Sequence, residues 1–133
     1  MKACLLDTNA LLCIGLDRST LKPSVRRRLV DAMLYASVAS AAEIAIKAAL
    51  GKFVPPPPFE TDFDAALRTL LTRAAVDPLP LGLPVVARLR HPPLHHRDPF
   101  DRMIIAQALE TGLTIATRDG VFSAYPGLDI LEI

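Results

Sequence analysis

Short apolar runs alternate with longer amphipathic or alanine-rich segments along this 133-residue chain. Four of the runs have the length and composition of buried strands, namely "ACLL" (3–6), "YASVAS" (35–40), "LTIAT" (113–117) and "LDILEI" (128–133). A fifth, "VDPLPL" (76–81), predicts an edge strand, because its prolines cannot donate ladder hydrogen bonds. Strands that alternate with helices predict an α/β fold in which helices cover both faces of a parallel sheet.

The expected helices are marked by apolar spacing and by residues that start or stop a helix. Val25, Leu29 and Met33 are four residues apart within the segment 21–34, which predicts an amphipathic helix. Proline at a first position and glycine just past an end bound the clearest helix, Pro99–Thr111. The remaining helices are expected at 40–52, stopped by Gly51, at 61–74, and at 84–93, ended by Pro92. Four prolines at 55–58 predict an extended connector within 53–61.

Composition restricts the class of protein. Apolar residues make up 51% of the chain, which is enough for a packed core and argues against disorder. The 15 Lys and Arg nearly balance the 14 Asp and Glu, so a heavily basic, non-specific nucleic-acid coat is not expected. No apolar run approaches the roughly 20 residues of a membrane span. We therefore expect a soluble, cytoplasmic protein with one domain over residues 1–133.

Five acidic side chains share one kind of position, at the end of an expected strand or the start of the helix that follows: Asp7, Glu43, Asp98, Asp101 and Asp119. In a parallel α/β sheet the carboxyl ends of the strands face one crevice, so these acids are expected to converge there. Two carboxylates about 4 Å apart repel by roughly 4 kcal/mol at an effective dielectric constant near 20. A hard divalent cation with oxygen ligands, Mg²⁺ or Mn²⁺, would relieve that repulsion.

Each acid also has a purely structural interpretation. Asp7 and Asp98 stand where N-caps are expected, and Ser40 with Glu43 forms the S-x-x-E pattern of a capping box. Asp119 precedes a glycine, as in an ordinary turn. Capping and metal binding are compatible, because a helix N-terminus orients the carboxylate that it displays.

Four blocks of the sequence resemble, in order, those of a PIN-domain ribonuclease, and they are most similar to bacterial VapC-type toxins of type II toxin–antitoxin pairs. The blocks are "LLDTNALL", "SVASAAEIAIKAALGK", "HHRDPFDRMIIAQALETGL" and "TIATRDGVFSAY". The similarity runs from Met1 to Ile133 and is loosest between Phe53 and Leu94. It implies a three-layer α/β/α PIN-like fold with a central parallel sheet of four to five strands.

The resemblance also implies an activity and its residues. The acids that match the catalytic quartet around Mg²⁺ or Mn²⁺ are Asp7, Glu43, Asp101 and Asp119, with Asp98 as a further ligand or only a helix cap. Thr8 and Thr117 match hydroxyl positions that support the acids. The reaction implied is metal-dependent hydrolysis of RNA phosphodiester bonds by an endoribonuclease. Candidate phosphate contacts are Lys47, Arg102 and Arg118, with His96 and Arg97 also near the site. An ordinary i,i+4 pair with Glu43 is an equally good interpretation of Lys47.

The family further implies a small antitoxin that occludes the site, and a homodimer. Two rival functions remain open at this point. A phosphatase with Asp7 as aspartyl nucleophile would want a second acid two residues on, where the chain has Asn9. A non-catalytic PIN-like module that binds a partner protein would have no need of the complete acid set.

Overall fold

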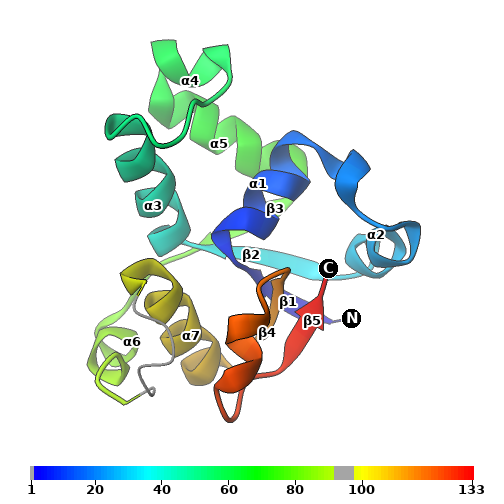
Figure 1. Cartoon of the computed structure of the whole chain (residues 1–133), viewed down its shortest axis with the longest axis vertical. Coiled ribbons are helices and arrows are strands. Elements are labelled where there is room, and N and C mark those ends of the chain that lie inside the picture. Colours follow the sequence, from blue (N-terminus) through cyan, green and yellow to red (C-terminus); the bar gives the residue numbers. More distant parts are fainter. Residues whose placement is uncertain (1, 92–97) are drawn as a thin grey trace.

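Five parallel strands form one central sheet in the order β3-β2-β1-β4-β5. The strands of this computed structural model, which describes residues 2–91 and 98–133, are β1 (Ala3–Leu6), β2 (Met33–Ser37), β3 (Val76–Leu79), β4 (Thr114–Thr117) and β5 (Ile130–Glu132). Figure 1 shows the sheet at the centre, with helices above and below it. The predicted α/β fold with a parallel sheet is confirmed, and the proline-containing β3 is an edge strand as expected.

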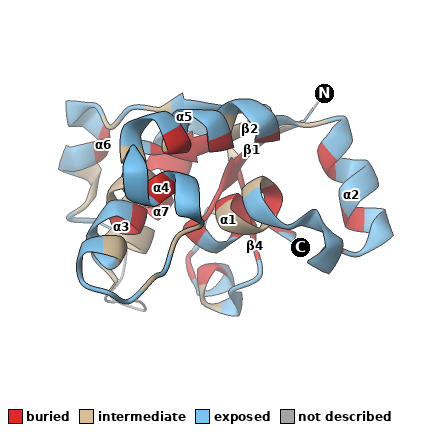
Figure 2. Cartoon of the chain, turned by 90° about the horizontal axis from the view of Figure 1, so that it is seen from above, coloured by how far each residue is buried: buried red, intermediate tan, exposed pale blue. Residues whose placement is uncertain are grey.

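Helices cover both faces of the sheet, because alternate side chains of each strand point to opposite faces. Leu6 of β1 packs into a core cluster with α1 (Thr8–Leu16), α2 (Pro23–Val30) and α5 (Phe63–Ala74). Its neighbour Leu5 packs into a second cluster with α7 (Pro99–Thr111) and η2 (Gly120–Ala124). Figure 2 shows buried residues along the strands and the inner helix faces, with exposed residues outside. The predicted three-layer α/β/α arrangement is therefore confirmed.

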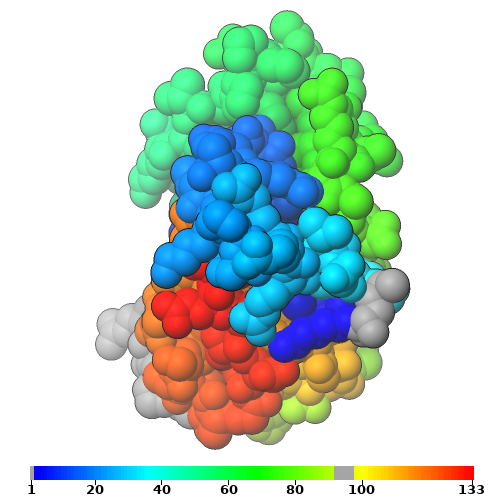
Figure 3. Space-filling view, turned by 90° about the vertical axis from the view of Figure 1, so that its right-hand side faces the viewer, coloured from blue at the N-terminus to red at the C-terminus, as the bar shows by residue number. Residues whose placement is uncertain are grey.

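The remaining helices connect these layers, and they are η1 (Arg18–Thr20), α3 (Val38–Ala49), α4 (Pro57–Thr61) and α6 (Leu83–Arg88). Helix α3 lies against both α1 and α7, and α6 packs on α7. On the face shown in Figure 3, α2 lies between the green α5 region and the red C-terminal strand. None of the helices in the described part of the chain is long and apolar enough to cross a membrane.

The boundary between β2 and α3 differs from the prediction. The strand spans Met33–Ser37 instead of 35–40, and α3 begins at Val38 with Ser37 as its N-cap, whose hydroxyl accepts from Ala39 N at 3.0 Å. The preceding helix accordingly ends at Val30. Alanine favours helix whereas valine and tyrosine favour strand, so the local pattern did not locate this boundary.

The proline run is the second difference. Pro57 and Pro58 occupy the first turn of α4, so only the first part of the predicted connector is extended. Proline is compatible with a first turn, because the amide protons missing there have no partner within the helix. The expected stops at Gly51 and Gly112 are confirmed, each with a positive φ, of 71° and 74°. Helix α6 ends at Arg88, before Pro92, which lies outside the described residues.

Candidate active site

The strand order places a topological switch point at the carboxyl ends of β1 and β4. From β1 the chain continues to β2 and β3 on one side of the sheet, whereas β4 is followed by β5 on the other side. The connections after β1 and β4 therefore diverge, which is where α/β sheets bind ligands. Asp7 directly follows β1, and Asp119 lies two residues after β4.

Asp7 is buried at this point, with only 3% of its surface exposed. It is the N-cap of α1, where its Oδ1 accepts from Ala10 N at 2.7 Å, and its Oδ2 accepts from the Thr117 hydroxyl. Burial raises the pKa of Asp7, and the nearby charges of Asp119 and Glu43 raise it further, against the two hydrogen bonds. The predicted cap is confirmed, and Glu43 and Asp119 both lie within electrostatic range of Asp7.

Thr117 joins the two acids at this switch point. Its hydroxyl is buried at the end of β4 and, besides donating to Asp7, accepts from Asp119 N at 2.9 Å. Asp119 in turn caps η2, with its Oδ1 accepting from Val121 N at 3.0 Å. The single hydroxyl therefore fixes the orientation of the first acid and the backbone position of the last one.

Glu43 enters the site from α3 and is buried as well. Its Oε1 accepts from Thr8 Oγ1 at 2.5 Å, and its Oε2 lies 2.6 Å from Lys47 Nζ. The predicted capping box of Ser40 with Glu43 is wrong, because the N-cap of α3 is Ser37, three residues earlier, and Ser40 lies inside the helix. The Glu43 carboxylate is thereby directed across to α1 instead of back to its own helix end.

Ser40 is a site residue that the sequence did not assign beyond that cap. Its side chain is fully buried, and its Oγ lies 3.1 Å from Thr8 Oγ1, which also bonds Glu43. The available signal was the i,i+3 spacing from Glu43, which places both side chains on one face of a helix.

Two further acids begin α7. Asp98 is its N-cap, and Oδ1 accepts from both Phe100 N at 2.8 Å and Asp101 N at 3.1 Å. Asp101 is half-buried in the first helical turn. Both carboxylates lie near the Lys47 ammonium, whose pKa is raised by its hydrogen bond to Glu43 and then by the charges of Glu43, Asp98 and Asp101. Lys47 is thus where the acids of α3 and α7 meet.

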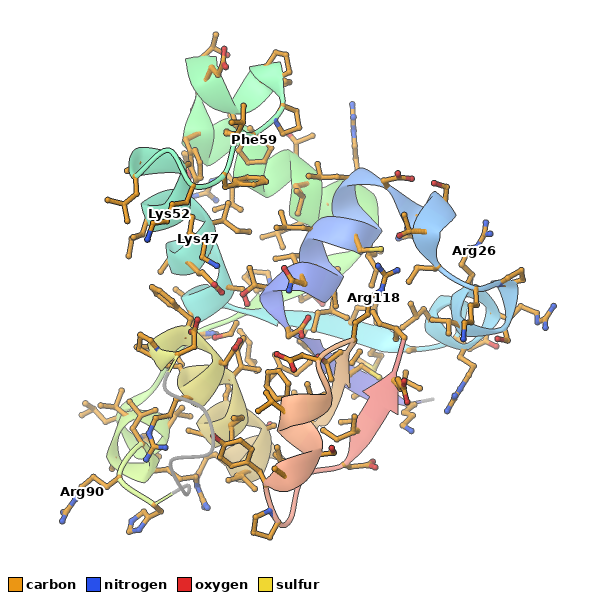
Figure 4. All side chains as sticks on the ribbon, in the orientation of Figure 1. Arg26, Lys47, Lys52, Phe59, Arg90 and Arg118 are labelled. Atoms are coloured by element: carbon orange, nitrogen blue, oxygen red, sulfur yellow. The ribbon has the colours of Figure 1, made fainter. Side chains whose placement is uncertain are left out.

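The predicted basic contacts are distributed differently. Arg118 reaches toward the connection between α1 and α2, where it donates to Thr20 O at 3.2 Å and Thr20 Oγ1 at 3.0 Å (Figure 4). Arg102 Nε donates to Leu89 O at 2.9 Å, at the end of α6. Lys47 contacts a site acid directly, so the i,i+4 pair that was one of its two interpretations is formed. His96 and Arg97 lie outside the described residues.

The donor chemistry of the site suits a hard divalent ion. Across the described residues, no three His, Cys, Asp or Glu side chains are arranged to hold a metal ion together. Mg²⁺, however, keeps several waters and commonly takes only one or two protein carboxylates. A buried aspartate whose pKa is raised by burial and by two other acids is a fitting ligand, because a dication would offset both effects.

Comparisons with known proteins agree with this fold. The family model of the PIN domain matches residues 4–128. The VapBC2 complex of Rickettsia felis, bound to a promoter DNA fragment, contains a chain with 14% identity and a TM-score of 0.71, and 98% of each chain is covered. A chain of a DNA-bound VapBC of Salmonella typhimurium has 18% identity and a TM-score of 0.67, and the match covers 99% of this chain and 98% of that one. A chain of a toxin–antitoxin complex from Klebsiella pneumoniae has 18% identity and a TM-score of 0.57, and the match covers 98% of this chain and 99% of that one.

Comparison with curated protein sequences gives no match. The three structures share the fold at low identity, whereas the family model covers nearly the whole chain and includes Asp7, Glu43, Asp101 and Asp119. The chain belongs to the PIN domain family.

Proposed function

We propose that this chain is a Mg²⁺- or Mn²⁺-dependent endoribonuclease, a single catalytic domain over residues 1–133 that acts as the toxin of a toxin–antitoxin pair. The observation that carries the proposal is the placement of Asp7. It is buried at the switch point of a PIN-domain sheet, within electrostatic range of Glu43 and Asp119. Burial and the two nearby acids all oppose the ionisation of Asp7, which supports a role in binding a cation.

Asp7 and Asp101 are the principal ligands in this proposal, directly or through water, and Glu43 and Asp119 complete the cluster or orient the attacking water. When bound, the ion lowers the pKa of a water molecule and neutralises charge on the phosphate. Thr8 and Thr117 keep the Glu43 and Asp7 carboxylates in fixed orientations through their hydrogen bonds. Asp98 positions Asp101 as the cap of α7, through a single oxygen, Oδ1.

The substrate is inferred from the family to be RNA. The chain has 7 aromatic residues (2 Tyr, 5 Phe) and no tryptophan, so it offers few platforms for base stacking. Selection by the shape of single-stranded loops is therefore expected in place of aromatic base reading. Lys47, half-exposed at the edge of the acids, is the candidate contact for a substrate phosphate.

A small antitoxin protein is the proposed partner, and a homodimer the proposed assembly. The support is the fold shared with chains of VapBC complexes and of a toxin–antitoxin complex. Co-expression with the product of an adjacent small gene tests this, since the pair should copurify and growth arrest by the chain alone should be relieved. A chain that causes no arrest and has no such neighbour would contradict the toxin assignment.

The activity is tested by incubating the purified protein with RNA and Mg²⁺ or Mn²⁺. Asp7→Asn is the informative variant, because asparagine retains an oxygen for the Ala10 N–H, removes the charge and replaces the oxygen that accepts from the Thr117 hydroxyl with an amide nitrogen. We expect cleavage by the wild type, a loss of about 100-fold or more in the variant, and none in EDTA. Undiminished cleavage by the variant or in EDTA would refute the metal mechanism.

A further inference from the structure

Lys47 is a positively charged group placed among acids of the site. It lies one turn after Glu43 on α3, and its Nζ is 2.6 Å from Glu43 Oε2. The two partners differ in solvent contact, since the Lys47 side chain is 47% exposed and that of Glu43 only 5%. In Figure 4 the Lys47 side chain lies nearer the centre of the molecule than that of Lys52, which follows α3.

Three acids from two helices act on this ammonium. The hydrogen bond to Glu43 and the charges of Glu43, Asp98 and Asp101 all raise its pKa. The ammonium is therefore charged at neutral pH and supplies positive charge at the point where the acids of α3 and α7 meet. Part of the repulsion expected among converging carboxylates is offset by a residue of the chain itself.

Both oxygens of Glu43 are already bonded in this arrangement, Oε1 by Thr8 and Oε2 by Lys47. We propose that Lys47 is the resident counter-cation of the acid cluster, and that a divalent ion displaces it from Glu43 when the ion binds. This inference rests on the proposed metal-dependent function and adds a step to it. The metal-free site is held by an internal cation that competes with the metal for one carboxylate.

Elementary electrostatics favours the exchange over joint occupancy. Coulomb energy scales with charge and inversely with distance. A dication at twice the distance of the carboxylate from the ammonium therefore repels the ammonium as strongly as the carboxylate attracts it. The lysine stem is flexible, and its ammonium is readily hydrated, so Lys47 loses little by leaving a half-exposed position. Glu43 is buried, cannot follow, and remains available to the metal.

The test is calorimetric titration of Mn²⁺ into the full chain, without RNA. Lys47→Met retains the apolar stem and removes the competing ammonium, so we expect Mn²⁺ to bind about five- to tenfold more tightly, the size of a coupling within one ion pair. Lys52→Met is the matched control, because it removes the same charge from an exposed side chain just beyond α3. Its Mn²⁺ affinity should change by less than about twofold.

A second background separates competition for Glu43 from simple repulsion through space. In Glu43→Gln the carboxylate that Lys47 blocks is gone, so adding Lys47→Met should no longer strengthen Mn²⁺ binding. Circular dichroism of each variant establishes that it is folded before titration.

The outcomes distinguish this inference from the function on which it rests. Equal Mn²⁺ affinities of Lys47→Met and Lys52→Met, or the same gain in the Glu43→Gln background, would overturn the exchange while leaving a metal-dependent site intact. A wild-type protein that binds no Mn²⁺ would overturn both.

Discussion

The Thr117 hydroxyl offers the sharpest test of how this site is assembled. Thr117→Val keeps the shape and the β-branched side chain of the buried residue but removes its oxygen. Two interactions disappear together, the bond donated to Asp7 Oδ2 and the bond accepted from Asp119 N. We expect the variant to be folded, less stable and much less active.

The magnitude follows from the two bonds. A buried hydrogen bond to a charged group contributes about 1.5–3 kcal/mol, and a bond between neutral groups about 1 kcal/mol. Asp7 is only 3% exposed, so water cannot replace the lost donor at Oδ2. Asp119 is exposed, and water can satisfy its amide. The expected loss of unfolding free energy is therefore about 2–4 kcal/mol, a large share of the roughly 5–15 kcal/mol of a typical domain.

The assay is equilibrium unfolding in urea with EDTA present, so that metal binding does not contribute. Thr117→Ser is the matched control, because it retains the hydroxyl and loses one methyl group, at a cost of about 1 kcal/mol. Metal-dependent RNA cleavage measured in parallel should fall in the valine variant and be largely retained in the serine variant.

The prediction would be refuted if the free energy of unfolding of Thr117→Val lay within about 0.5 kcal/mol of the wild-type value, a change typical of uninvolved surface positions. It would also be refuted if the valine and serine variants lost equal stability. Either result would mean that the hydroxyl does not hold Asp7 in the folded protein.

Two further predictions concern Asp7 and Asp98. Because the pKa of Asp7 is raised in the native state, the free energy of unfolding of the metal-free protein should fall as pH rises above the ordinary aspartate pKa, by about 1.4 kcal/mol per unit of pKa difference. Asp7→Asn in EDTA should lack this loss. Equal pH slopes of the two proteins in urea unfolding would contradict the prediction. Asp98→Ala should lose about 1–2 kcal/mol through the missing cap of α7, whereas Asp98→Asn should keep that stability and retain more RNA cleavage than Asp101→Asn. Asp98→Asn losing as much cleavage as Asp101→Asn would instead make Asp98 a ligand.

Sequence signals were sufficient wherever a local rule with a strong physical basis applied. The bounds of α7, Pro99–Thr111, were predicted correctly, because each of its end signals acts within one turn of a helix end. An aspartate cap and a proline mark the start, and a glycine in the left-handed region marks the end. The bounds of β1 were also correct, since its short apolar run ends at an acid that caps the next helix. The order of strands and helices then implied a parallel sheet.

Local rules failed where neighbouring residues have opposing preferences for helix and strand. The segment 35–40 consists of alanine, serine, valine and one tyrosine, and the start of α3 within it is decided by packing and by the Ser37 cap. The run of prolines predicts extended chain, but Pro57 and Pro58 form the first turn of α4, a position that accepts proline equally well.

The sequence by itself determined which side chains stand at the carboxyl ends of the strands, and therefore that acids gather at one edge of the sheet. Only the tertiary structure decided the hydrogen-bond partners at this edge: Thr117 with Asp7, Thr8 with Glu43, and Arg118 with Thr20. Residues such as Asp7 and Thr117 are 110 positions apart in sequence. A bond between them depends on strand order and on the packing of α1 against the sheet, which no local pattern of residues encodes.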